Sequence, residues 1–293
     1  MTYEFTSGDE LLLLTQTEEL GIGEIMLRRE MAREDAPREA LIEKMHRNLE
    51  TMRASVQKGL GEKQSSVSGL TGGDAEALLE YSEGESFCGA RVCRAVASAM
   101  AVVEVNASMG RIVAAPTAGA SGILPGALIE CGRERGWSDE MLIMGLYTAA
   151  AVGMVIARNA SISGAEGGCQ AETGSAAAMA AAALVECAGG TPLAALHASA
   201  IALKNVLGLV CDPVAGLVEC PCIKRNALGA ANAMLSADMA LAGIESIIPF
   251  DEVVGAMRSI GRSMSSDLRE TARGGLAATP TGRALKKRLK LDL

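Results

Sequence analysis

The organising stretch of this chain is Gly208-Leu-Val-Cys211-Asp-Pro-Val-Ala-Gly-Leu-Val-Glu-Cys220-Pro-Cys222-Ile-Lys-Arg-Asn226. It brings three of the eight cysteines together among two prolines and two glycines. Proline fixes φ and removes a backbone donor, whereas glycine permits bends, so a helix interior is disfavoured here. Because Ala-rich apolar sequence runs on both sides, we predict a rigid loop that holds thiols inside a helical body.

Composition favours helices over strands. Aromatic residues make up only 2% of the 293 residues, while Ala, Leu, Met and Gly are abundant. Strands draw on β-branched and aromatic side chains, and a chain of this length can bury a large core. We therefore predict an all-α fold, with a single large helical domain over 1–293 whose active site is built from loops between helices. A polar helical section is expected over 1–58 and the body of the domain over 59–293.

Helical spacing and terminal residues place the individual helices. Ser7 and Glu10 fit a capping box before the first helix, and Pro37 suits the first turn of a long helix ending near Gly59. Asp74 is expected to cap the next helix. Further helices are predicted from Cys88 to about Val105, from the 161–174 loop to Cys187, from Thr191 to about Leu207, over 227–242, from Phe250 to about Met264 and over 267–275, with a basic helical tail at 283–290.

The net charge and the number of cysteines indicate which partners and which cellular compartment to expect. The net charge of −8 and the pI near 5.0 argue against nucleic acid as a partner, because phosphate binding requires clustered Lys and Arg. Residues Met1 to Gly8 contain neither a basic region nor a small-residue cleavage site, so no secretory leader is expected. Eight cysteines without such a leader indicate a reducing compartment, the cytoplasm, where thiols are free, catalytic or metal-bound.

One uncharged run, Met141–Ala157, has the composition of an apolar helix. Its roughly 17 residues lie at the lower edge of the length that spans a bilayer. Several small residues, Thr148 and Tyr147 lie within it, and Glu140 and Arg158 stand directly outside. We expect a buried core helix at this position and no association with a membrane.

Two loops combine hydroxyl side chains with glycine. The first contains Ser68, Gly69, Thr71 and Gly72, and the second, over 111–122, contains Thr117 and Gly119. Such loops leave backbone N–H groups free to face an anion, and a helix follows each of them. Together they are expected to bind a small anion such as a carboxylate, with an ordinary flexible linker as the alternative for the first loop.

Four cysteines are candidates for a shared site: Cys169, Cys211, Cys220 and Cys222. Cys169 precedes an Ala-rich helix, whose dipole is expected to stabilise its thiolate. The spacing matches neither paired zinc motifs nor compact ferredoxin motifs. In an extended segment Cys220 and Cys222 would share a face, but a turn at Pro221 would break that alternation, so both stay candidates. The other four are expected to be packing thiols (Cys88, Cys93, Cys131 and Cys187).

Longer motifs in the chain resemble those of a known family, the iron–sulfur L-serine dehydratases, and specifically the α subunit of the two-chain form. The resemblance extends over essentially the whole chain. It rests on Ala115-Pro-Thr-Ala-Gly119, Gly164-Ala-Glu-Gly-Gly-Cys-Gln170, Leu207-Gly-Leu-Val-Cys-Asp-Pro-Val-Ala-Gly216, Pro-Cys222-Ile-Lys-Arg-Asn226, Ser68-Gly-Leu-Thr-Gly-Gly73 and Glu270-Thr-Ala-Arg-Gly-Gly-Leu276.

The resemblance implies a cofactor and its ligands. In that family a [4Fe–4S] cluster replaces pyridoxal phosphate, and the cysteines that match its ligands are Cys169, Cys211 and Cys222. The family pattern does not require cysteine at Cys220. Three protein ligands leave one iron open to act as a Lewis acid.

The implied reaction is the cytoplasmic deamination of L-serine to pyruvate and ammonia, a lyase step in amino-acid degradation and gluconeogenesis. The open iron would stabilise the departing β-hydroxyl while a base removes the α-proton. The loops around Ser68 and Thr117 would hold the substrate carboxylate and orient it. Another cluster-dependent hydro-lyase acting on a different hydroxy acid, or a non-enzymatic zinc or redox protein, is the alternative.

Two departures from the single-chain family members bear on partners. Those members carry an additional regulatory domain and end in a cysteine that caps the open iron, whereas this chain ends Lys290-Leu-Asp-Leu293. The resemblance therefore implies a separate regulatory β subunit and a hetero-oligomer. The base is unassigned: it could come from the β subunit, and Lys204 is a candidate because it lies close in sequence to the cysteine stretch. A lysine at the C-terminal end of a helix more commonly interacts with the negative end of the helix dipole.

Overall fold

The regular elements of the chain are helices. The computed structural model describes residues 3–290, and these contain no strand, only an isolated bridge between Cys211 and Arg269. The α-helices are α1 (Gly8–Glu18), α2 (Ile22–Glu34), α3 (Arg38–Gly61), α4 (Asp74–Tyr81), α5 (Gly89–Ala107), α6 (Ile123–Arg135), α7 (Asp139–Asn159), α8 (Gly164–Gly167), α9 (Ser175–Cys187), α10 (Pro192–Lys204), α11 (Cys222–Leu241), α12 (Phe250–Ser263) and α13 (Pro280–Leu289). Short 3₁₀ turns lie at Ala118–Ala120, Val214–Gly216, Ser266–Leu268 and Gly275–Ala278, and a π-helical turn at Gln170–Gly174 leads into α9. The predicted all-α fold is confirmed.

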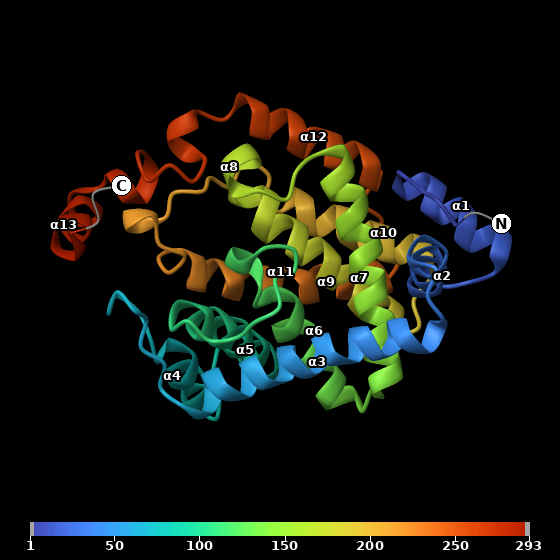
Figure 1. Ribbon diagram of the computed structural model, residues 1–293, viewed down its shortest axis with the longest axis horizontal. Coiled ribbons are helices and arrows are strands. Elements are labelled where there is room, and N and C mark those ends of the chain that lie inside the picture. Colours follow the sequence, from blue (N-terminus) through green and yellow to red (C-terminus); the bar gives the residue numbers. More distant parts are fainter. Residues whose placement is uncertain (1–2, 291–293) are drawn as a thin grey trace.

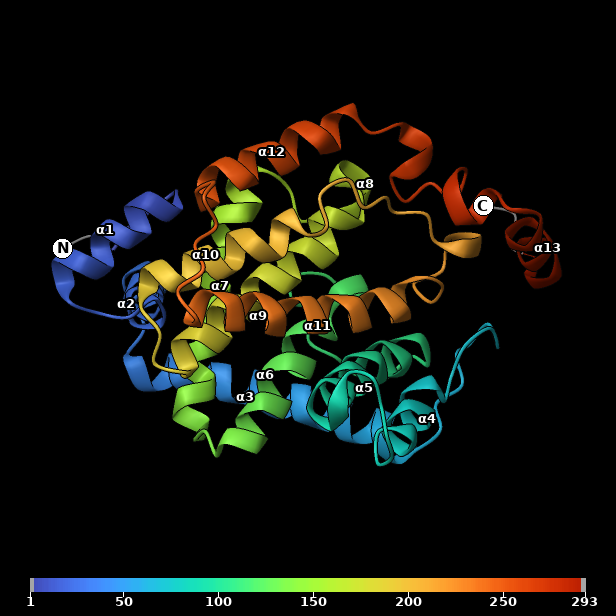
Figure 2. The same ribbon diagram turned by 180° about the vertical axis from the view of Figure 1, so that it is seen from behind.

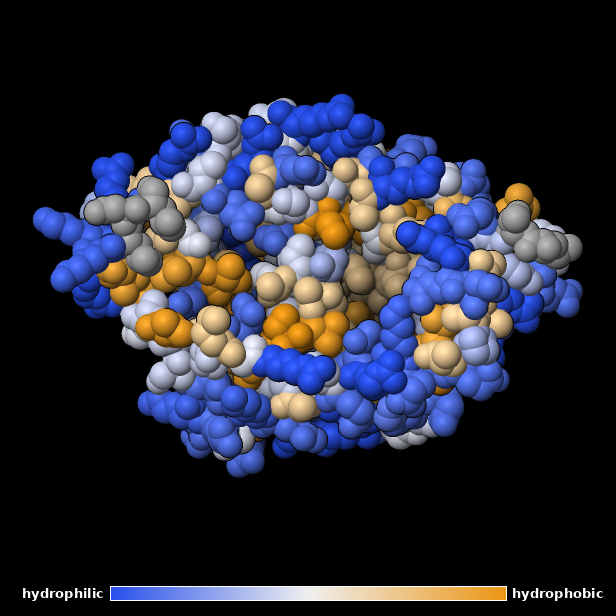
Figure 3. Space-filling model, in the orientation of Figure 1, coloured by the Kyte–Doolittle hydropathy of each residue, from blue (hydrophilic) through white to orange (hydrophobic). Residues whose placement is uncertain are grey.

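The helices are arranged in a bundle with a central helix and a periphery. Helix α9 lies in the middle, with α6, α7, α10 and α11 packed around it (Figures 1 and 2). Helix α3 runs along one side of the bundle against α5 and α7, and α4 packs on α5. On the opposite side α12 crosses α10 and contacts α8 (Figure 1), and its outer surface is hydrophilic (Figure 3). Helix α13 lies at one end, beside the Val214–Gly216 turn.

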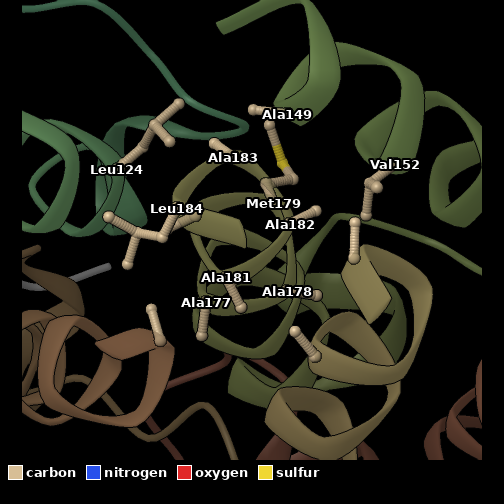
Figure 4. Packing of buried hydrophobic residues seen from close by; sticks show 14 of the residues in the cluster. Leu124, Ala149, Val152, Ala177, Ala178, Met179, Ala181, Ala182, Ala183 and Leu184 are labelled. Atoms are coloured by element: carbon tan, nitrogen blue, oxygen red, sulfur yellow. The ribbon is translucent and has the colours of Figure 1, made fainter. Parts of the chain in front are cut away.

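Alanine allows the central helices to approach closely. Every residue of α9 from Ser175 to Val185 is buried, and most of them are alanines, which lose no side-chain entropy on folding (Figure 4). Two glycines of α7 face this helix. A Cβ added at Gly145 would lie 2.6 Å from the sulfur of Cys187, and one at Gly153 would lie 2.9 Å from the sulfur of Met179. Small residues on both helices therefore set the short distance between α7 and α9.

Helix α7 is the apolar run that could have spanned a membrane by length and composition. Its most apolar window is 67% buried within the protein, where it packs against α9 and α2. Tyr147 in this helix donates to the carbonyl of Leu41 in α3 at 2.9 Å. The prediction of a buried core helix is confirmed.

Helix starts are capped by groups from other parts of the chain as well as by local ones. The Ser7 hydroxyl accepts from the N–H of Glu10 at 3.1 Å, as predicted, whereas the Glu10 carboxylate reaches the N–H of Thr6. Asp74 does not cap α4. The carboxylate of Glu104 in α5 accepts from the N–H groups of residues 73–75, and burial raises the pKa of Glu104.

Carboxylates cap two further helices across the bundle. Glu186 of α9 accepts from the first N–H groups of α2, and Asp251 of α12 accepts from those of α1. Burial raises the pKa of Glu186. These long-range caps satisfy backbone donors that no local side chain reaches, and they fix α1 and α2 on the body of the protein.

The chain differs from the sequence-based expectation in three further places. The predicted helix over 267–275 is absent, because this segment pairs with Cys211: the Cys211 N–H donates to Leu268 at 2.8 Å, and the Glu270 N–H donates to Cys211 at 2.7 Å. A loop backbone needs such partners, and the glycine pair that follows weakens a helix. Helix α11 begins at Cys222, earlier than expected. Cys88 is exposed, whereas Cys93, Cys131 and Cys187 are buried as predicted.

The contact between α3 and α5 provides a test of this packing. A Cβ at Gly59 would lie 2.5 Å from the carbonyl oxygen of Ala101, a backbone atom that cannot move without shifting α5. We expect Gly59→Ala to lower the free energy of unfolding in urea by about 1–3 kcal/mol. Gly61→Ala in the same helix is the matched control, since its Cβ would meet nothing within 4 Å. The control should be neutral or stabilising by up to about 1 kcal/mol, and equal losses in both variants would contradict this close packing.

Candidate active site

The structure brings Cys169, Cys211 and Cys222 together from three separate segments. Cys169 precedes the π-helical turn that starts α9, Cys211 lies in the extended segment after α10, and Cys222 is the first residue of α11. The charges of Cys169 and Cys222 both raise the pKa of Cys211, so the three thiols lie close enough to interact. None of the eight cysteines forms a disulfide.

These thiols are held in their neutral form in the bare protein. Burial is the main cause that raises the pKa of Cys169 and of Cys211, and it raises the pKa of Cys222 to about 12. The hydrogen bond with Thr173 and the charge of Arg225 lower the pKa of Cys169, but burial outweighs them. The stabilisation expected from the helix dipole stays a prediction. A metal that coordinates these sulfurs would deprotonate them.

Arg225 connects the segments that carry the cysteines. Its guanidinium donates to the carbonyl of Val210 and to Asp212 Oδ1, each at 2.7 Å, and it also hydrogen-bonds Cys169. The side chains of Arg225 and Asp212 are only 14% and 4% exposed, so this is a buried ion pair. The other carboxylate oxygen of Asp212 accepts from the N–H of Leu276 at 2.7 Å. One ion pair thus joins the first turn of α11, the Cys211 segment and the 270s segment.

Asn226 attaches the second hydroxyl loop to the same helix turn. Its amide donates to the carbonyl of Gly119 at 2.7 Å and to Cys222 at 2.9 Å, and its Oδ1 accepts from the N–H of Gly122 at 3.0 Å. Its side chain is buried. These bonds fix the loop that presents Thr117.

Glu172 lies between the second hydroxyl loop and the cysteines. Its carboxylate accepts from the Thr117 hydroxyl at 2.8 Å, and its other oxygen lies 3.9 Å from the sulfur of Cys211. Burial, with a smaller effect of the Glu270 charge, raises the pKa of Glu172. A Cβ at Gly164 would lie 2.8 Å from this carboxylate and 3.0 Å from the sulfur of Cys211, so both side chains pack closely against this glycine.

The first hydroxyl loop meets a second buried carboxylate, that of Glu219. The hydroxyls of Ser68 and Thr71 donate to the same oxygen of Glu219 at 2.9 and 2.8 Å, and Glu219 is 5% exposed. Gly69 and Gly72 have positive φ, and a Cβ at Gly72 would lie 2.0 Å from the carbonyl oxygen of Gln64. Since Glu219 belongs to the cysteine stretch, both hydroxyl loops lie beside that stretch.

The Lys204 amine and the two histidines are engaged elsewhere in the described structure. The Lys204 amine donates to the carbonyl of Ser246, whose N–H donates to His197 Nδ1 at 3.3 Å. His46 lies 3.5 Å from Asp139 on the surface of α3. The role of Lys204 as a base stays a prediction.

Sequence reasoning assigned no role to five polar residues of the site. Each is a charged or amide side chain inside an apolar or glycine-rich segment, a position where burial demands a partner. That signal could have identified them as paired groups, although their partners lie far away in sequence. They are Glu172, Asp212, Glu219, Arg225 and Asn226.

The three cysteines do not form a compact trio of ligand atoms in the bare protein. Sulfur ligands of a tetrahedral zinc ion, about 2.3 Å from the metal, lie about 3.8 Å apart. Within residues 3–290 the trio of ligand groups that lies within 4.8 Å is His46, Glu50 and Asp139, and the three cysteines form no such trio.

Comparison with known proteins places the chain among named relatives. The model of the family "Serine dehydratase alpha chain" matches residues 17–277. The chain is 54% identical to the probable L-serine dehydratase, alpha chain, of Bacillus subtilis, over 97% of this chain and 95% of that one. It is 47% identical to the L-serine dehydratase, alpha chain, of Peptoniphilus asaccharolyticus over 91% of each. It is 41% identical to the L-serine dehydratase of Streptomyces coelicolor, over 94% of this chain but only 61% of that protein.

The ion pair at the site can be tested against its neighbour in sequence. Arg225→Met leaves Asp212 buried without a cation, so we expect the free energy of unfolding to fall by about 3–5 kcal/mol in urea. Lys224→Met is the matched control, because Lys224 pairs with Asp74 at the surface, where the two side chains are 58% and 39% exposed. The control should cost less than about 1 kcal/mol. Equal effects of the two substitutions would show that the Arg225 pair does not hold the segments together.

Proposed function

The chain belongs to the serine dehydratase alpha-chain family, and we propose that it is a lyase that converts L-serine to pyruvate and ammonia. The observation that carries this proposal is the meeting of Cys169, Cys211 and Cys222 beside two loops of hydroxyl groups. Thiols and hydroxyls supply what the reaction needs: ligands for a Lewis acid, and donors that hold a carboxylate.

We propose that the three cysteines hold a [4Fe–4S] cluster. The donor set suits such a group: the three thiols are free of disulfides, and they lie close enough for their charges to interact. When bound, a cluster with three protein ligands supplies a Lewis acid that assists departure of the substrate β-hydroxyl. The chain itself holds the segments that carry the cysteine ligands in place, because Arg225 hydrogen-bonds Val210 and Asp212.

We propose that Ser68, Gly69, Thr71, Gly72, Thr117 and Gly119 bind and orient the substrate carboxylate. The hydroxyls of Ser68, Thr71 and Thr117 already donate to carboxylate oxygens in this structure, those of Glu219 and Glu172. Hydroxyl donors in this arrangement suit a carboxylate, and a bond to a charged group is stronger than a neutral one. Holding the carboxylate in this way would orient the α-proton and the β-hydroxyl of serine.

We propose that a separate β chain completes the enzyme as a hetero-oligomer. Two relatives that match along nearly their full length are named alpha chains, whereas this chain spans 61% of the Streptomyces relative. The Lys204 amine is engaged by a carbonyl in the connection between α11 and α12. The base that removes the α-proton is therefore assigned to the β chain in preference to Lys204.

Substitution of single cysteines tests the cluster and the reaction together. We expect the anaerobically purified protein to show broad absorbance at about 400 nm, typical of iron–sulfur charge transfer. With its partner added, it should form pyruvate from L-serine. Cys169→Ser, Cys211→Ser and Cys222→Ser should each lose iron and activity, whereas Cys220→Ser should keep both.

Three results would contradict this proposal. Stoichiometric zinc without iron would exclude the cluster and favour a zinc protein. Loss of iron in Cys220→Ser would show that the ligand set is wrong. Turnover of D-serine or L-threonine in preference to L-serine would exclude the proposed substrate.

The hydroxyl loops can be tested separately from the cluster. Ser68→Ala and Thr117→Val each remove one donor, so we expect KM for L-serine to rise about tenfold or more while iron content is unchanged. Ser65→Ala is the matched control, because Ser65 is exposed in the same loop. An unchanged KM in both loop variants would exclude these hydroxyls from substrate binding.

A further inference from the structure

A cavity of about 360 Å³ lies on the side of the protein covered by α12. It is bounded by α8, α12 and the segment after α12, and three arginines line it: Arg258, Arg262 and Arg269. Arg258 and Arg262 also line an adjoining recess that reaches Asn159 at the end of α7. Figure 3 shows hydrophilic side chains gathered along this edge of the molecule, over α12.

The three guanidinium groups carry charge that the chain itself does not neutralise. Across residues 3–290 none of them forms an ion pair. The Nε of Arg269 is buried and has no hydrogen-bond partner, and its Nη1 reaches only the Glu166 carbonyl, at 3.5 Å. Elsewhere in the protein buried guanidiniums are paired, as Arg225 is with Asp212.

The carboxylates near the cavity are already occupied. Glu166 accepts from the Ser161 hydroxyl at 2.6 Å, and Asp251 of the adjoining recess caps α1 through the N–H groups of Gly8 and Asp9. The cavity therefore has three positive groups and one acidic side chain in its lining. Such an excess attracts an anion and leaves its guanidiniums free to bind one.

We propose that this cavity binds a small anion that carries two or more carboxylate or phosphate groups. The planar fork of arginine matches both groups in bidentate geometry, and three forks around one space suit a ligand with more than one anionic group. The volume is that of a small-molecule pocket. The ligand would also supply the acceptor that the buried Nε of Arg269 lacks.

The walls of this cavity are the segments that carry two of the cysteines. Gly167 and Ala171, which line it, flank Cys169, and Arg269 forms the backbone bridge with Cys211. Helix α12 rests on the same loop: Gln170 donates to the carbonyl of Met257 at 3.0 Å. A bound anion would hold α12, α8 and the Arg269 segment together, and thereby the ligand segments. This regulatory consequence rests on the proposed function, whereas the binding itself does not.

Calorimetric titration of the purified full chain tests the binding. At constant ionic strength set with NaCl, we expect citrate or inorganic pyrophosphate to bind saturably at one site, and to raise the melting temperature. Arg258→Gln and Arg262→Gln should each weaken binding about tenfold or more, as should Arg269→Gln. Arg258 and Arg262 are exposed, so these two variants should keep the melting temperature of the unliganded protein. Arg283→Gln, at an exposed position of α13, is the control and should leave the affinity unchanged.

Three outcomes would overturn the proposal. The first is absence of saturable binding of both citrate and pyrophosphate. The second is equal weakening in Arg283→Gln, which would show unspecific charge attraction. The third is that the unsubstituted chain binds no anion while Arg258→Gln and Arg262→Gln lose co-purification with the β chain. That result would assign this face to a protein partner. Because titration needs neither cluster nor serine turnover, failure of this proposal is distinguishable from failure of the proposed dehydratase activity.

Discussion

The site depends on one buried ion pair, that of Arg225 with Asp212. A guanidinium and a carboxylate withdrawn from water are tolerated only when most of their hydrogen-bonding capacity is used. Here the donors reach a backbone carbonyl and a carboxylate of the Cys211 segment, and the second carboxylate oxygen takes an N–H from the 270s segment. Segments with no regular structure of their own therefore acquire a defined position, because each satisfies a charge that would otherwise be uncompensated.

The core explains how such irregular segments can be held accurately. The alanines of α9 and the glycines of α7 bring helices close together, so the helix ends that flank the site are fixed by packing. Long-range caps from Glu104, Glu186 and Asp251 add polar constraints at helix starts. The loops of the site are thus attached to a rigid helical scaffold, which is the usual arrangement for binding and catalytic residues.

Much of the fold could be predicted from the sequence, because apolar spacing, helix caps and composition are local properties. The ligand set drawn from the cysteine motifs stays a prediction. What could not be predicted depends on tertiary contacts: the pairing of Glu172 with Thr117, that of Glu219 with Ser68 and Thr71, and the extended backbone around Arg269. The burial of Cys169, which raises the pKa of its thiol, depends on tertiary contacts in the same way.

The bond from Leu276 to Asp212 has a consequence for biosynthesis. Domains fold from the N-terminus as they leave the ribosome, yet the Cys211 segment receives partners from residues 268, 270 and 276, which are synthesised after all the helices of the central bundle. The central helices can therefore assemble while translation continues, before the Cys211 segment has its full set of backbone partners. This segment takes its final position late, on a chain whose core is already folded.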